Sequence, residues 1–297
     1  MSLVMHYVLC FVAALIVSAP PGESRAAEKF KAVASFSILA DLVKQVGGEH
    51  VDVTAIVGPD GDAHVFQPSP LDAKAVADAG IVVVNGLGLE GWVARLIQSS
   101  GTKAPVVVAS HGVRPLEGEG EDTGKVDPHA WQSIANAKIY VANIRDGLIS
   151  ADPADRADFE AKAKAYLARL DQLETEVKAA IASIPPKNRR IITTHDAFGY
   201  FGRAYGMSFI APQGVSTETE PSAKDVATII RQVKAQHVPA VFLENISDDR
   251  LMQQIARETG AKIGDKLYSD ALPGKGAATY IDMMHNNIAA FVKALQQ

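Results

Sequence analysis

The chain has 297 residues, a formal net charge of −5 and 47% apolar side chains, which is typical of a globular protein large enough for two domains. An acidic chain without a lysine or arginine cluster is not expected to bind nucleic acid. Beyond the N-terminal segment, no stretch is apolar enough to span a membrane.

Residues 1–27 have the pattern of a secretory signal peptide. An almost continuous apolar run, residues 3–17, precedes small residues and two small-x-small cleavage sequences that end at Ala26 and Ala27. Cys10, the one cysteine, lies within this segment at a position that does not suit a lipid anchor. The mature chain therefore has no thiol for a disulfide or a zinc site. We expect a soluble periplasmic protein.

Short apolar runs alternate with helical patterns in residues 28–150, which predicts an N-terminal α/β lobe. Such alternation is typical of parallel strands joined by right-handed crossovers. The expected strands are residues 30–36, 51–57, 81–84 and 106–108, and the expected helices are residues 38–46, 70–79, 90–98 and 133–149. Residues 112–125, which hold four glycines and four acidic residues, predict a mobile surface loop.

Residues 151–186 contain the longest uninterrupted helical signal and predict a helix that links two lobes. Asp152 is a good N-cap, Pro153 suits the first helical position, and Pro185 and Pro186 end the run. Apolar residues recur at steps of three or four, at Phe159, Ala163, Tyr166, Leu170, Leu173, Val177, Ala180 and Ile184. A helix of this length spans about 45 Å at about 1.5 Å per residue.

The alternation resumes in residues 187–297 and predicts a C-terminal α/β lobe. The expected strands are residues 190–194, 207–210, 240–243 and 260–263, and the expected helices are residues 222–236, 249–258 and 277–295. No sequence repeat relates the two halves, although their layouts are alike. The predicted fold is α/β, with two lobes of parallel βα units joined by one long rigid helix.

Polar residues that follow the predicted strands are candidates for a ligand site, because parallel α/β sheets bind ligands beyond the carboxyl ends of their strands. Five residues lie at this edge: His64, His111, His129, His195 and Asp270. Imidazoles combined with a carboxylate form sites for first-row transition metals, zinc above all. Any one of these histidines alone is better explained as a surface or capping residue, and it is the set of four such residues, two from each half, that favours a metal site.

Other functional classes have weaker support. Residues 86–91 match the dinucleotide-binding pattern G-x-G-x-x-G. However, the strand before them is the third of its sheet, and the next strand does not end in an acidic residue that could bind a ribose. A tight turn is therefore the better interpretation. The chain has neither a G-x-S-x-G nor an H-E-x-x-H motif. A zinc-dependent hydrolase is kept as an alternative, and we expect a protein without enzymatic activity or catalytic residues.

Seven segments resemble, in order, the zinc- and manganese-binding solute-binding proteins of ABC importers, the ZnuA/TroA-like family. They are residues 62–70 (DAHVFQPSP), 85–92 (NGLGLEGW), 127–131 (DPHAW), 194–201 (THDAFGYF), 220–222 (EPS), 242–244 (FLE) and 268–272 (YSDAL). The resemblance implies the metal ligands His64, His129, His195 and Asp270, with the metal between the lobes. It also implies that the protein captures Zn²⁺ in the periplasm and delivers it to an ABC permease in the inner membrane.

The third ligand position bears on the metal. Manganese-binding members of the family often have a carboxylate there, and a histidine such as His195 is typical of zinc binders, so we expect Zn²⁺ with Mn²⁺ as the alternative. Many zinc-binding members have a histidine-rich loop where this chain has the short acidic residues 112–125. That difference leaves loading by a periplasmic metallochaperone open, and it suggests that the four acids of the loop concentrate cations. We expect a monomer.

Further residues are expected around the metal. Phe66, Trp131 and Phe198 are candidates for an apolar wall. Glu244 is expected to orient a ligand histidine, and His111 is a candidate auxiliary ligand.

Overall fold

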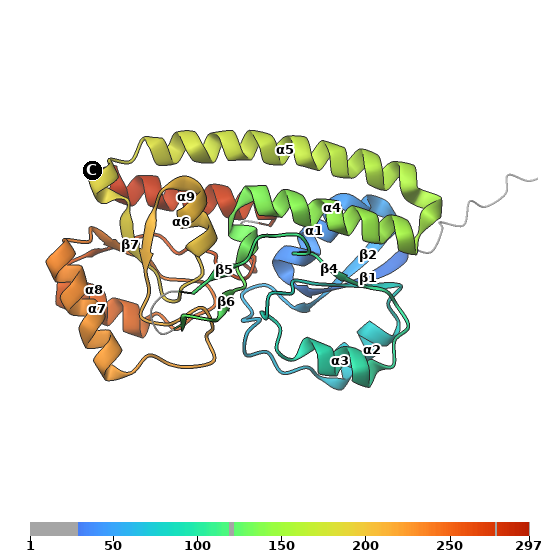
Figure 1. The fold of residues 1–297 in the computed structure, drawn as a ribbon, viewed down its shortest axis with the longest axis horizontal. Coiled ribbons are helices and arrows are strands. Elements are labelled where there is room, and N and C mark those ends of the chain that lie inside the picture. The colour runs from blue at the N-terminus through green and yellow to red at the C-terminus, as the bar shows by residue number, and fades with distance from the viewer. Residues whose placement is uncertain (1–28, 119–121, 277, 297) are drawn as a thin grey trace, which may run out of the picture.

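The computed structural model describes residues 29–118, 122–276 and 278–296. The predicted signal peptide, residues 1–27, lies outside the described residues. Within them, none of the helices combines the length and apolar character that crossing a bilayer requires. Two parallel sheets lie side by side, and a long helix runs over both of them (Figure 1).

The first sheet forms the core of the N-terminal lobe and has the strand order β2-β1-β3-β4. Its strands are β1 (Phe30–Phe36), β2 (Val51–Val57), β3 (Ile81–Val84) and β4 (Val106–Val108), all parallel. The accompanying helices are α1 (Ser37–Gly47), α2 (Pro70–Ala77), α3 (Val93–Ser100) and α4 (Ile134–Ala151). β3 is buried along its whole length, as its unbroken apolar sequence predicts for a strand covered on both faces.

The second sheet has the order β10-β9-β7-β8 and is also parallel. Its strands are β7 (Arg190–Ile192), β8 (Ser208–Ile210), β9 (Ala240–Val241) and β10 (Lys262–Ile263). Its helices are α6 (Gly199–Tyr205), which was not predicted, α7 (Ala223–Gln236), α8 (Arg250–Thr259) and α9 (Tyr280–Leu295). Counted along the chain, both sheets have the order second, first, third, fourth, so two lobes without a sequence repeat share one topology.

Helix α5 (Arg156–Ala182) is the predicted link between the lobes. It packs against α1, α4, α6 and α9 (Figure 1) through a stripe that uses Ile181 in place of the predicted Ala180. The last predicted member, Ile184, is buried but lies beyond the end of the helix. The predicted start is wrong, because Asp152 ends α4, donating its N–H to Leu148 O at 2.7 Å, and a 3₁₀ turn (Pro153–Asp155) comes before the α-helix.

One hydrophobic core runs through most of the molecule. It contains side chains of the first sheet, the buried stripe of α5, and residues such as Phe201 and Phe291 from the C-terminal lobe. A smaller separate core lies beneath α7 and α8 and includes Ile230, Met252 and Ile255. The α/β fold is confirmed, whereas the lobe boundaries, 28–150 and 187–297 with the link at 151–186, stay predictions because the main core crosses them.

The glycine-rich residues 86–91 form a tight turn. Gly86 has a φ of 82°, and a Cβ there would lie 2.5 Å from Val108 Cγ1, so only glycine fits. The buried Glu90 carboxylate accepts the N–H of Asn85 at 2.6 Å and the hydroxyl of Ser35 at 2.5 Å. Glu90 therefore belongs to the turn, and α3 begins three residues later than expected.

The acidic stretch 112–125 is not wholly a surface loop, which corrects the prediction. β5 (Leu116–Glu117) pairs antiparallel with β6 (Val126–Asp127) and forms a short ladder between the two lobes (Figure 1). Asp122 is buried, accepts the N–H of Val215 at 2.8 Å and pairs with Lys125 Nζ at 2.6 Å. This acid is used to hold the lobes together and is not free to concentrate cations; residues 119–121 lie outside the described part.

Candidate metal centre

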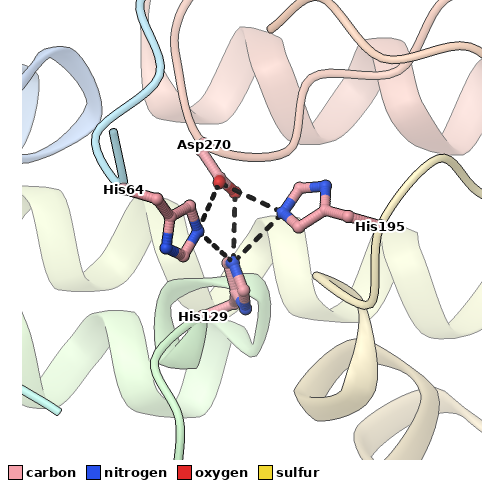
Figure 2. A group of neighbouring side chains, drawn as sticks. All are labelled: His64, His129, His195 and Asp270. Carbon is pink, nitrogen blue, oxygen red and sulfur yellow. Dashed lines mark hydrogen bonds and ion pairs between the residues drawn. The ribbon is translucent and has the colours of Figure 1, made fainter. Parts of the chain in front are cut away.

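Four side chains that are far apart in the sequence meet between the two sheets (Figure 2). His64 and His129 come from loops of the N-terminal lobe, and His195 and Asp270 come from loops of the C-terminal lobe. His64 is 5% exposed and the other three are fully buried. One potential ligand atom of each residue lies within 4.8 Å of the others. The structure thus brings together the four residues of the predicted ligand set.

Five separations between these atoms are close to those between the ligands of a first-row metal ion. His129 Nε2 lies 3.2 Å from His64 Nε2 and 3.3 Å from His195 Nε2. Asp270 Oδ2 lies 3.2 Å from Nε2 of both His64 and His195, and Asp270 Oδ1 lies 3.5 Å from His129 Nε2 (Figure 2). A tetrahedron with metal–ligand bonds of about 2.0–2.1 Å has edges of about 3.3–3.4 Å. The five measured separations, 3.2–3.5 Å, therefore suit an ion of the size of zinc.

Two buried carboxylates orient the rings of His129 and His195. Asp127 Oδ1 lies 2.7 Å from His129 Nδ1, and Glu244 Oε2 lies 2.6 Å from His195 Nδ1. A neutral ring that donates its Nδ1–H to a carboxylate presents an unprotonated Nε2, which is the form that binds a metal. The orienting role was expected for Glu244 and was not expected for Asp127.

Glu244 also shapes the backbone that carries His195. Its Oε1 accepts the N–H of Thr194 at 2.7 Å and that of His195 at 3.1 Å. β7 ends at Ile192, two residues earlier than predicted. The Thr193 N–H still donates to Ile210 O at 3.1 Å, but the next two amides donate to the Glu244 side chain. One carboxylate fixes both the main chain and the ring of this residue.

The same short pattern precedes two of the histidines, in residues 62–64 (DAH) and 127–129 (DPH). In each case Oδ1 of the aspartate accepts the backbone N–H of the histidine at 2.9 Å. Asp127 uses this oxygen for the imidazole as well, whereas Asp62 uses its second oxygen to accept the Thr217 hydroxyl at 2.6 Å. The D-x-H pattern was a usable sequence signal for both aspartates.

Asp270 brings a negative charge into the centre of the protein. Among the described residues, neither of its carboxylate oxygens has a hydrogen-bond donor in good geometry, although ring nitrogens surround them. The preceding loop is fixed from the N-terminal lobe, because Trp131 Nε1 and Gln132 Nε2 donate to Ser269 O at 2.9 and 2.7 Å. A buried carboxylate held in this way requires a cation beside it.

The charges of the site are strongly coupled. Burial lowers the pKa of the His129 imidazole, but Asp270 and Asp127 outweigh this effect and raise that pKa to about 9. Burial likewise opposes a charge on His195, yet Glu244 and Asp270 hold its pKa well above the usual value. Burial alone would raise the pKa of Asp270, and the two imidazoles instead hold it well below its usual range. Positive charge on the imidazoles and negative charge on Asp270 thus stabilise each other, and a metal that binds there has to displace the protons.

The predicted apolar wall is present only in part. Trp131 is fully buried, and its ring lies 5.3 Å from the ring of His129. Phe66 instead packs against Trp92 at 5.2 Å, and Phe198 lies in the core of the C-terminal lobe. Of the three residues, Trp131 is the one with a ring contact to a ligand histidine among the described residues.

The predicted auxiliary ligand His111 does not join the cluster, because its side chain is exposed. A second group of potential ligands lies at the start of α5 and is partly exposed. There, His50 Nδ1 lies 2.9 Å from an Asp155 oxygen, and His50 Nε2 lies 2.8 Å from an Asp158 oxygen. This arrangement is explained by one imidazole bridging two carboxylates.

Comparisons with known proteins agree on the family. A family model described as the periplasmic component A of a zinc-uptake complex matches residues 32–294. The manganese-binding lipoprotein MntA of Halalkalibacterium halodurans is 36% identical over 292 residues, 98% of this chain and 96% of that protein. The iron-binding protein YfeA of Yersinia pestis is 32% identical over 277 residues, 92% of this chain and 89% of that protein.

A solved structure supports the same family. The periplasmic zinc-binding protein TroA of Treponema pallidum has a TM-score of 0.86 at 28% identity, and the match covers 91% of this chain and 100% of that one. The three named relatives bind manganese, iron and zinc, so they agree on the class of protein and differ in the metal. The chain belongs to the ZnuA/TroA-like family of metal-binding substrate-binding proteins, which work with the membrane permeases of ABC importers.

Proposed function

We propose that the protein captures Zn²⁺ with His64, His129, His195 and Asp270 and delivers it to the permease of an ABC importer. The observation that carries this proposal is the closed set of three Nε2 atoms and one carboxylate, with neighbouring atoms 3.2–3.5 Å apart and shielded from solvent. Three nitrogen ligands and one oxygen ligand in a tetrahedron suit Zn²⁺ better than most divalent ions.

Mn²⁺ is the second candidate for the transported metal. A relative that covers nearly the whole chain is named as manganese-binding. Both oxygens of Asp270 face the ring nitrogens, which offers a fifth ligand atom to an ion that prefers oxygen. Affinity for a nitrogen-rich site nevertheless rises from Mn²⁺ to Zn²⁺, so Zn²⁺ should bind more tightly at equal free concentrations.

A zinc-dependent hydrolase is the weaker alternative. Hydrolytic zinc sites keep one coordination position for a water molecule that the metal activates. Here four protein side chains surround the centre, and the most exposed of them, His64, is 95% covered. This closure, together with membership of a family of binding proteins, supports capture and release without catalysis.

We place the protein in the periplasm as a monomer. The predicted signal peptide at residues 1–27 and the periplasmic description of the matching family support this location. The permease of the inner membrane is the proposed partner. A periplasmic metallochaperone is a further proposed partner, because residues 112–125 contain no histidine-rich sequence that could collect zinc.

Metal analysis of the protein purified from the periplasm tests this function. We expect one equivalent of zinc and, in a competition titration, displacement of Mn²⁺ by an equal concentration of free Zn²⁺. Retention of Mn²⁺ under those conditions would favour the alternative metal. A purified protein that binds neither ion would contradict the proposal.

A further inference from the structure

The loop that carries His64 is fastened to the C-terminal lobe by an aspartate that is not one of the proposed ligands. The Asp60 N–H donates to Leu272 O at 2.9 Å. Its Oδ1 accepts from Asn245 Nδ2 at 2.9 Å, and its Oδ2 accepts the N–H of Gly274 at 2.9 Å. Asp60 thus makes three hydrogen bonds to the opposite lobe.

These three partners lie beside the ligands of the C-terminal lobe. Leu272 and Gly274 follow Asp270 by two and four residues, and Asn245 follows Glu244, the carboxylate that orients His195. A single N-terminal side chain therefore connects the loop of one ligand to the supports of two others.

A second aspartate of the same loop makes a parallel connection. Asp62 accepts the backbone N–H of His64 with one oxygen and the Thr217 hydroxyl with the other, at 2.9 and 2.6 Å. Asp127 is the corresponding aspartate of the other D-x-H segment. Its hydrogen bonds are to the backbone and the ring of His129, in its own lobe. Asp62 is the member of the pair that reaches across the lobes.

We propose that Asp60 and Asp62, with their partners Asn245 and Thr217, form a clasp that sets how fast the metal leaves. Both aspartates are positioning residues. The inference rests on the proposed function, because it assumes a metal held by residues of both lobes. The metal draws the ligand loops together from inside, and the clasp holds the same loops together at the surface, where Asp60 is exposed.

The clasp should act on dissociation more than on association. Release requires His64 to separate from Asp270, and the loops that carry them cannot part while Asp60 joins them. In this proposal the metal enters through an open form of the metal-free chain, in which the clasp residues make no contacts across the lobes. Removing the clasp therefore speeds release and leaves the rate of capture nearly unchanged, as most changes in affinity appear in the rate of dissociation.

The backbone at Asp60 allows a clean substitution. Asp60 has a φ of 56° in a turn closed by the Gly61 N–H donating to Gly58 O at 3.2 Å. Glycine and asparagine both tolerate this left-handed conformation. Asp60→Gly removes the carboxylate without strain. Asp60→Asn keeps one acceptor oxygen, but its NH₂ group then faces one of the two donors, Asn245 Nδ2 or the Gly274 N–H.

Thr217 provides a matched pair of variants in the other lobe. Thr217→Val removes the hydroxyl and keeps the shape of the side chain, whereas Thr217→Ser keeps the hydroxyl that binds Asp62. Asp52→Asn, in the exposed part of β2, controls for the loss of one negative charge from the N-terminal lobe.

The test is the release of Zn²⁺ from the loaded full chain into excess chelator, followed by stopped flow, together with the association rate. We expect Asp60→Gly to speed release by about tenfold or more and Asp60→Asn by less. Thr217→Val should speed release by about threefold to tenfold, while Thr217→Ser and Asp52→Asn stay near the wild-type rate. Association rates should change by less than about threefold.

If both Asp60→Gly and Thr217→Val bind zinc normally and release it at the wild-type rate, the clasp proposal is wrong and the proposed function still stands. A lowered melting temperature of the metal-free variants without faster release would have the same meaning, since that is the mark of a merely structural role. If Asp60→Gly does not fold, the Thr217 pair decides the question. A wild-type chain that binds no zinc would overturn the proposed function and the clasp together.

Discussion

The two sheets have the same strand order, yet the lobes around them are stabilised differently. In the N-terminal lobe, β1 and β2 are seven residues long and pair in register from Phe30 with Val51 to Phe36 with Val57. The strands of the C-terminal lobe are two or three residues long, and its outer helices have a separate small core. A buried carboxylate bonds to backbone amides in each lobe, Glu90 in the first and Glu244 in the second, so the difference lies in the length of the paired strands and in the packing.

This difference bears on how a metal would act. The ligands His64 and His129 come from the firmly packed lobe, and His195 and Asp270 come from the lobe with short strands. A metal that joins the two pairs therefore adds more order to the C-terminal side. The following experiments compare the two lobes through their ligands, their protons, their orienting carboxylates and their shared contacts.

The largest effect is expected from removing one ligand. His195→Ala and His64→Ala should each weaken Zn²⁺ binding by at least about a hundredfold, because one of four ligands contributes about 3 kcal/mol to a site worth roughly 10–16 kcal/mol. Competition titration measures the change. His285→Ala, in an exposed pair with Glu176, is the matched control and should bind like wild type. Unaltered affinity in His195→Ala would remove it from the ligand set.

The next largest effect is expected in the pH dependence of stability and of zinc affinity. The pKa of His129 is about 9 in the folded chain, above the ordinary value of about 6.5. Its protonated form therefore stabilises the metal-free protein fully below about pH 6.5, and this contribution, up to about 3 kcal/mol, is lost as the pH rises through 9. Zinc affinity should rise over the same range because the ligands lose protons.

Urea unfolding at pH 6.5 and pH 9, with and without zinc, measures both trends. The metal-free protein should be less stable at the higher pH, and the extra stability that zinc adds should be greater there. A metal-free stability that does not change with pH would mean that no proton holds His129 and Asp270 together.

Replacing each of the two orienting carboxylates by its amide compares the lobes directly. Asp127→Asn and Glu244→Gln should each weaken zinc binding by about 10–100-fold, as is common for groups that hold a ligand histidine. The loss should be greater for Glu244→Gln, because that carboxylate also binds the amides of Thr194 and His195. The opposite order in isothermal titration would show that the short-stranded lobe does not depend on Glu244.

The smallest predicted effect concerns a contact between the lobes away from the ligands. The Tyr200 hydroxyl of α6 accepts the N–H of Leu116 at 3.0 Å and donates to Asp127 O at 3.3 Å. Tyr200→Phe should lower the free energy of unfolding by about 1 kcal/mol and leave zinc affinity within about threefold of wild type. A larger loss of affinity than of stability would show that β5 and β6 position His129.

The strands and helices followed from sequence because their signals are local. The apolar period of α5 predicted nearly all of its buried stripe, the strand pattern of residues 30–36 predicted β1, and the continuous apolar run of residues 81–84 predicted β3. Two of the boundary errors fall where a side chain outside the element bonds to backbone amides. Glu90 folds back into its turn and delays α3, and Glu244 bonds to the amides that follow β7.

The meeting of the four candidate ligands could not follow from periodicity, because it depends on how two sheets pack across α5. Position after a strand selected five residues, and the family resemblance reduced them to the four that the structure brings together. The D-x-H pattern could have revealed the roles of Asp62 and Asp127. The contact between Asp60 and Asn245 joins residues 185 positions apart and leaves no local signal.

Anomalous diffraction at the zinc absorption edge, on crystals of the zinc-loaded protein, tests the central claim most directly. The account predicts one strong peak between the lobes, about 2.0–2.2 Å from Nε2 of His64, His129 and His195 and from an oxygen of Asp270. A zinc peak at any other position, or one bound by residues of a single lobe, would contradict it.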